Sequence, residues 1–112
     1  MEQLSFLETV AVITTTVGSA EDAHRLAQAA VQSGCAACVQ IEPITSHYLW
    51  QGELECTKEW RLVLKTAPAA VPDVLEWLDA QHPYEVPQLL VRMEHANTAY
   101  AAWVAEQVNA KK

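Results

Sequence analysis

The sequence is poor in positive charge and has no long apolar run. Lys and Arg number 7 against 14 Asp and Glu, which gives a net charge of −7. A protein that binds duplex nucleic acid or an anionic membrane needs a basic face, so this composition argues against both classes. No apolar run approaches the ~18 residues that cross a bilayer. The opening Met1-Glu2-Gln3 also lacks the basic start and apolar stretch of a secretory signal.

Several motifs that carry chemistry are also missing. The 4 His form no H-x-x-x-H pair, and there is neither a phosphate-binding G-x-x-x-x-G-K-[ST] loop nor a readable Ser-His-Asp triad. We therefore predict a protein that is not an enzyme. The 3 Cys are an odd number, which does not indicate a disulfide framework. This usage favours a reducing compartment, and we expect a cytoplasmic protein.

The spacing Cys35-Ala36-Ala37-Cys38 is the one recognisable cysteine motif. A redox pair needs its reactive thiol at a helix N-terminus, whereas this pair follows the end of a predicted helix. A structural zinc site needs four ligands, and the chain has no second C-x-x-C. We therefore expect these cysteines, and Cys56 as well, to be small buried residues.

The periodicity of the apolar residues predicts an α+β domain of 112 residues without internal repeats. Residues 1–8 are a lead-in, and residues 9–112 form a single domain. A helix is expected to start at the Ser19 cap and to end at Gly34, and a third helix to start at the Asn97 cap. The remaining predicted elements are strands at 9–16, 36–50, 53–65 and 89–93 and a helix at 71–82. This βαββαβ order with an added C-terminal helix predicts a ferredoxin-like sandwich.

The two central strands form a long hairpin around a Gln51-Gly52 turn. The apolar residues change parity at Pro43, so we predict a bulge or bend there. Arms of ~14 residues are ~46 Å long, whereas a compact domain of this length is ~34 Å across. The hairpin should therefore project beyond its own domain.

The projecting part of this hairpin is rich in apolar side chains. A lone two-stranded ribbon is marginal in water, so a neighbouring subunit is expected to cover it. We predict a homo-oligomer, with a trimer as the smallest ring beyond a dimer. The alternative is that the hairpin folds back over its own sheet after Pro43. The expected interface residues are Tyr48, Leu49, Trp50, Leu54 and Cys56.

Three segments together resemble the CutA family of divalent-cation tolerance proteins. They are residues 36–43, residues 46–66, which contain Ser-His-Tyr-Leu-Trp-Gln-Gly and Leu-Lys-Thr, and residues 82–87 with the sequence His-Pro-Tyr-Glu-Val-Pro. The resemblance covers residues 9–108. It implies a ferredoxin-like fold, a homotrimer built through the long hairpins, and a role in the response to divalent metal ions, with copper binding in bacterial members.

The copper ligands implied by the resemblance are incomplete in this chain. Family members with described ligands have a Cys where this chain has Thr15 and a His-His pair where it has Gln81-His82. The metal candidates are therefore His82 and Cys38, with weak binding of Cu²⁺ or another divalent cation at clefts between subunits. His82 has an alternative role, which is to complement the dipole at the end of its helix.

A small-ligand cleft is the other functional prediction. Its expected residues are Trp50, Glu59, Lys65 and Tyr84, which are polar and aromatic groups from the segments that carry the resemblance. The alternative function is a signalling or scaffold module, similar to the PII proteins, that binds a metabolite or a protein partner. We predict no nucleic-acid or membrane partner.

Overall fold

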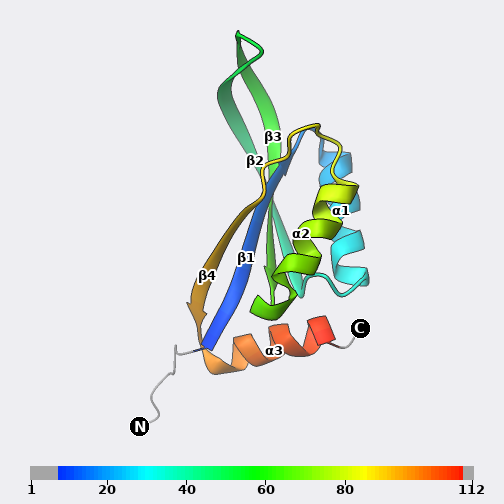
Figure 1. Cartoon of the computed structure of the whole chain (residues 1–112), viewed down its shortest axis with the longest axis vertical. Coiled ribbons are helices and arrows are strands. Elements are labelled where there is room, and N and C mark those ends of the chain that lie inside the picture. Colours follow the sequence, from blue (N-terminus) through cyan, green and yellow to red (C-terminus); the bar gives the residue numbers. More distant parts are fainter. Residues whose placement is uncertain (1–7, 110–112) are drawn as a thin grey trace.

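An antiparallel sheet forms the body of the molecule (Figure 1). The structure is a computed structural model that describes residues 8–109. The strands are β1 (Glu8–Val17), β2 (Cys38–Trp50), β3 (Glu53–Thr66) and β4 (Leu90–Ala96), in the order β2-β3-β1-β4. The helices are α1 (Ala20–Gln32), α2 (Val71–Gln81), which follows a short 3-10 turn η1 (Pro68–Ala70), and α3 (Thr98–Asn109). The predicted ferredoxin-like fold with an added C-terminal helix is confirmed.

The core lies between β1, β3 and the helices. Ile13, Val17, Leu62 and Leu64 are fully buried on these two strands. β1 is an inner strand between β3 and β4, and its run of β-branched and apolar residues suits a strand that is buried along most of its length. Within residues 8–109, no helix is long and apolar enough to cross a membrane.

The predicted ends of α1 are confirmed. The Ser19 hydroxyl oxygen accepts a hydrogen bond from the Asp22 backbone N–H at 3.1 Å, as an N-cap does. Gly34 follows the helix with φ of 80°, a left-handed conformation that suits glycine. Glu8, which we assigned to the lead-in, is the first residue of β1. Residues 1–7 of the lead-in and residues 110–112 of the predicted domain lie outside the described residues.

The β2-β3 hairpin projects beyond the helices, as its length predicts (Figure 1). Its strands have 13 and 14 residues, and the molecule measures 56 × 31 × 21 Å. The radius of gyration is 15.5 Å, against about 13 Å for a compact domain of this length. The turn places Gln51 at φ 51° and Gly52 at φ 84°. Two positive φ values are the geometry that a two-residue turn needs to match the strand twist.

Of the bulge or bend predicted at Pro43, the bulge is wrong. Pairing between β2 and β3 continues without a shift from Cys38 opposite Lys65 to Trp50 opposite Glu53. Since β2 is an edge strand, a Pro can sit in it without interrupting the sheet. The apolar residues change from odd to even positions because the hairpin extends past the helices at this point. Beyond it, the covered face of β2 is the one opposite to the face that packs against the helices.

Burial along the projecting hairpin follows this change of face. Leu49 and Leu54 are 71% and 76% exposed, and Cys56 is exposed too. The expectation that Cys56 is buried is therefore wrong for the single chain. Cys35 and Cys38 are half-buried at the edge of the core.

β4 begins one residue later and ends three residues later than predicted. Its residues are mostly exposed because it is the other edge strand.

Candidate functional site

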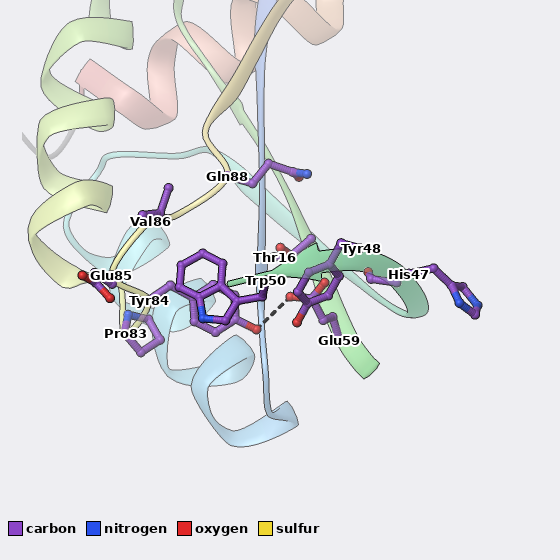
Figure 2. Close-up of a pocket in the computed structure, with 11 residues that line it drawn as sticks. Thr16, His47, Tyr48, Trp50, Glu59, Pro83, Tyr84, Glu85, Val86 and Gln88 are labelled. Atoms are coloured by element: carbon purple, nitrogen blue, oxygen red, sulfur yellow. Dashed lines mark hydrogen bonds between the residues drawn. The ribbon is translucent and has the colours of Figure 1, made fainter. Parts of the chain in front are cut away.

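A cavity of about 680 Å³ lies where the projecting hairpin meets the loop between α2 and β4 (Figure 2). Its volume falls within the range of small-molecule sites, about 300–1,000 Å³. The strands and the loop contribute both aromatic and polar side chains to its wall. The lining residues are Thr16 of β1, Ser46, His47, Tyr48 and Trp50 of β2, Glu59 of β3, and Pro83, Tyr84, Glu85, Val86 and Gln88 of the loop.

The central contact in this wall joins the loop to the sheet. The Tyr84 hydroxyl donates a hydrogen bond to Glu59 Oε2 at 2.7 Å, drawn as the dashed line in Figure 2. Glu59 is only 8% exposed. Burial, and then the hydrogen bond to Glu59, raise the pKa of the Tyr84 phenol. The phenol therefore stays protonated at neutral pH and acts as the donor, while the carboxylate is the acceptor.

Gly18 at the end of β1 makes room for this contact. A Cβ atom at Gly18 would lie 3.1 Å from the Tyr84 hydroxyl oxygen, which is closer than most carbon contacts. The φ of Gly18 is not in the positive region, so the lack of a side chain, and not backbone freedom, is what this position uses. Gly18, which ends the strand, therefore also leaves the space that the Tyr84 phenol occupies.

His82 holds the same loop from the other side. Its Nδ1 accepts the Tyr84 backbone N–H at 3.1 Å, so the neutral ring carries its proton on Nε2. Nε2 lies 2.9 Å from Thr15 Oγ1 and donates to it. Burial lowers the pKa of His82, while the Thr16 backbone as a hydrogen-bond acceptor and the negative charge of Asp79 act in the opposite direction. His82 therefore clamps the loop to β1 as a neutral ring.

The cavity brings together three of the four residues that we predicted for a ligand cleft. Trp50, Glu59 and Tyr84 line it, and Figure 2 shows them on one side of the hairpin with Tyr48. Lys65 does not line it. It lies six residues further along β3, about 20 Å from Glu59 at the usual rise per residue. There its Nζ donates to Gln40 Oε1 at 3.0 Å.

The two metal candidates are not brought together. Cys38 pairs with Lys65 at the far end of the β2-β3 ladder, whereas His82 contacts Thr15 beside the cavity. The resemblance places copper ligands at the positions of Thr15 and His82, and these two side chains are in contact. In this chain, however, Thr15 offers a hydroxyl where those family members have a thiol. Both ring nitrogens of His82 are already hydrogen-bonded. Among the described residues, no group of three or more His, Cys, Asp or Glu side chains is arranged to hold a metal ion. The described residues of one chain therefore do not form a preassembled divalent-cation site.

The sequence reading missed most of the remaining wall. Thr16 of β1 and Ser46 of β2 line the cavity, and no local motif in the sequence marks either residue for this role. Glu85, Val86 and Gln88 lie in the loop whose His-Pro-Tyr-Glu-Val-Pro segment carries the family resemblance, and that segment was the signal available. The predicted interface residues all lie on the projecting hairpin, where Tyr48 and Trp50 are also part of the cavity wall.

Comparisons with known proteins give a consistent result. The model of the family described as "CutA1 divalent ion tolerance protein" matches residues 11–107. A divalent-cation tolerance protein CutA from Thermus thermophilus is 40% identical over 97 residues, covering 85% of this chain and 94% of that protein.

Solved structures extend the similarity to the fold. CutA from Synechococcus elongatus superposes with a TM-score of 0.90 at 36% identity, covering 95% of this chain and 96% of that one. A second structure of that protein, complexed with a Bis-Tris molecule, has a TM-score of 0.85 at 35% identity and covers 94% and 99% of the two chains. A protein from Archaeoglobus fulgidus described as a periplasmic divalent cation tolerance protein CutA has a TM-score of 0.83 at 30% identity, covering 88% and 98%.

Proposed function

Because this chain belongs to the CutA1 divalent ion tolerance protein family, we propose that it serves divalent-cation tolerance as a homotrimer that binds a small ligand in the cavity between hairpin and loop. The observation that carries the proposal is that the projecting hairpin supplies both an uncovered apolar tip and two aromatic walls of the cavity. Assembly and ligand binding then share one structural element.

The exposure of the hairpin tip supports the proposal of a trimer. Leu49 and Leu54 gain nothing from the chain's own core, and covering one such side chain stabilises by about 1.5–3 kcal/mol. Three copies that cover one another's tips form a closed ring, whereas open head-to-tail contacts make fibres. Sedimentation equilibrium should give a mass three times that of one chain at micromolar concentration.

Substitution at the tip tests this assembly without touching the core. Leu54→Glu should weaken the trimer, because it places a charge in each covered tip. Val31→Glu is the matched control, since Val31 is also an exposed apolar residue but lies on α1. A well-folded monomer of the wild-type chain at micromolar concentration would contradict the proposal.

For the metal, we propose that Cu²⁺ or another divalent cation binds weakly and only where subunits meet. The support is that one chain offers His82 without a second nitrogen or sulfur ligand beside it, and thiol or imidazole ligands are what copper prefers. Isothermal titration of Cu²⁺ into the wild type and into His82→Ala measures this directly. Equal Cu²⁺ affinity of the two proteins would show that His82 is not a ligand.

A second candidate is a PII-like signalling or scaffold role with a metabolite as ligand. The cavity volume favours it, and the S. elongatus relative has a structure complexed with Bis-Tris, a small organic molecule. A thermal-shift screen separates the two candidates. A large shift with a metabolite and none with metal ions favours the signalling role.

We also propose action by binding, without catalysis, because the names of the relatives describe tolerance and not a reaction. Turnover of an acyl phosphate at a useful rate would contradict this. The proposed location is the cytoplasm, on the basis of the odd number of cysteines. The A. fulgidus relative is described as periplasmic, so cell fractionation is the deciding measurement.

A further inference from the structure

From the wall of the cavity we infer that its ligand is an organic ammonium ion, held by the Glu59 carboxylate and the rings of Tyr48, Trp50 and Tyr84. This rests on the proposed function, because it names the class of small ligand that the cavity takes. It also separates that ligand from the divalent cation, for which residues 8–109 of one chain form no cluster of three or more ligating side chains.

The first support is a buried negative charge without a positive partner. Glu59 is 8% exposed, and within residues 8–109 its carboxylate forms no ion pair and accepts a hydrogen bond from Tyr84 alone. Buried carboxylates are normally paired with a cation, since desolvation of the charge is costly otherwise. A neutral phenol compensates only in part, so the Glu59 carboxylate retains an attraction for positive charge.

Neighbouring cations of the chain do not supply that charge. Arg61 is the next residue on the same face of β3, but its Nη1 donates to Glu42 Oε1 at 2.8 Å. Lys65 is further along the strand and donates to Gln40. Within the part of the chain that the structure describes, neither Lys nor Arg lines the cavity. The described residues of one chain therefore leave the positive charge to come from a bound group.

The second support is the aromatic lining. Tyr48, Trp50 and Tyr84 line the same cavity as Glu59, and Figure 2 shows the His47 ring pointing away from the other side chains. Aromatic faces attract cations, and Trp does so most strongly. A bare divalent ion gains little from such faces and prefers several oxygen, nitrogen or sulfur ligands. An ammonium group on an organic frame uses both the carboxylate and the rings.

The accessible oxygen of Glu59 gives the cation a defined position. Oε2 is occupied by the Tyr84 hydroxyl, whereas Oε1 accepts no hydrogen bond from residues 8–109. No fully enclosed side-chain oxygen in this part of the chain lacks a partner, so Oε1 retains access to the cavity. Ser46, Thr16 and Gln88 in the same wall offer hydroxyl and amide groups to polar arms of the ligand.

Choline and its neutral isostere 3,3-dimethylbutan-1-ol test the inference directly. The two probes have the same shape and differ in charge. We expect choline to bind at least about tenfold more tightly than the neutral alcohol, measured by NMR titration in phosphate buffer at pH 8. Amine buffers are avoided because they are themselves organic ammonium ions.

Two substitutions that each remove one negative charge identify the site. Glu59→Gln should lower choline affinity about tenfold while leaving the affinity of the neutral alcohol unchanged. Glu106→Gln is the matched control, since Glu106 is exposed on α3 and does not line the cavity. Light scattering on each sample confirms that assembly is unchanged.

The outcomes separate this inference from the proposed function. Equal binding of choline and the alcohol, lost in both cases in Trp50→Ala, would show a ligand cavity without cation preference and would overturn the inference alone. Failure of choline to bind a wild-type trimer would also overturn it. Binding of Cu²⁺ that Glu59→Gln abolishes, with no binding of choline, would assign the carboxylate to the metal instead.

Discussion

Replacing Tyr84 with Phe tests the contact on which the cavity depends. The substitution removes the hydroxyl that donates to Glu59 at 2.7 Å and leaves the ring in place. The carboxylate is 8% exposed and loses its single hydrogen-bond donor among residues 8–109. A hydrogen bond to a charged group contributes about 1.5–3 kcal/mol, and a buried acceptor left without a donor costs a similar amount. We expect Tyr84→Phe to lower the free energy of unfolding by about 2 kcal/mol.

Urea denaturation at one fixed protein concentration measures this loss, because the stability of the proposed homo-oligomer would depend on concentration. Tyr48→Phe is the matched control. Its hydroxyl accepts only a long 3.4 Å contact from Thr57 on the exposed hairpin, so the change should stay within about 0.5 kcal/mol. Adding Glu59→Gln to Tyr84→Phe removes the uncompensated charge and should recover most of the loss.

Two results would refute this reasoning. Equal stability of Tyr84→Phe and wild type would show that Glu59 is solvated in solution and not dependent on the phenol. A double variant no more stable than Tyr84→Phe would show that the loss comes from packing of the loop, and not from the unpaired carboxylate.

Three further predictions concern the loop and its anchors. Burial lowers the pKa of His82, so the unfolded chain binds a proton more readily than the folded one. The free energy of unfolding of the wild type should therefore fall between pH 7.5 and pH 5 by more than that of His82→Asn. Urea denaturation at both pH values measures this difference. Thr15→Cys places a thiol beside the His82 ring, and Cu²⁺ affinity should rise in titration calorimetry but not in the same variant with His82→Ala. Gly18→Ala places a Cβ 3.1 Å from the Tyr84 hydroxyl and should destabilise by about 1 kcal/mol, with no such loss in the Tyr84→Phe background, where the hydroxyl is absent.

The sequence predicted the elements well where one local rule decided them. The Ser19 cap, the left-handed Gly34 and the Gln51-Gly52 turn all occur as expected, because each depends on a few neighbouring residues. The length of the hairpin was also predictable, since strand rise is nearly constant.

Long-range packing was harder to predict. The parity change at Pro43 has two local explanations, a bulge or a change in which face is covered, and only the position of the helices decides between them. Lys65 and Glu59 share a face of β3, but the sequence does not show where along that face the α2-β4 loop crosses. That crossing is what selects Glu59 and leaves Lys65 outside the cavity.

The use of one hairpin for two purposes has a thermodynamic consequence. Tyr48 and Trp50 form part of the cavity wall and also lie on the segment that we expect neighbouring subunits to cover. Anything that favours the assembled arrangement of these rings then raises affinity for the occupant, and the occupant favours assembly by the same factor. In the proposed ring, dilution of the protein and depletion of the proposed ligand would thus both favour separation of the subunits.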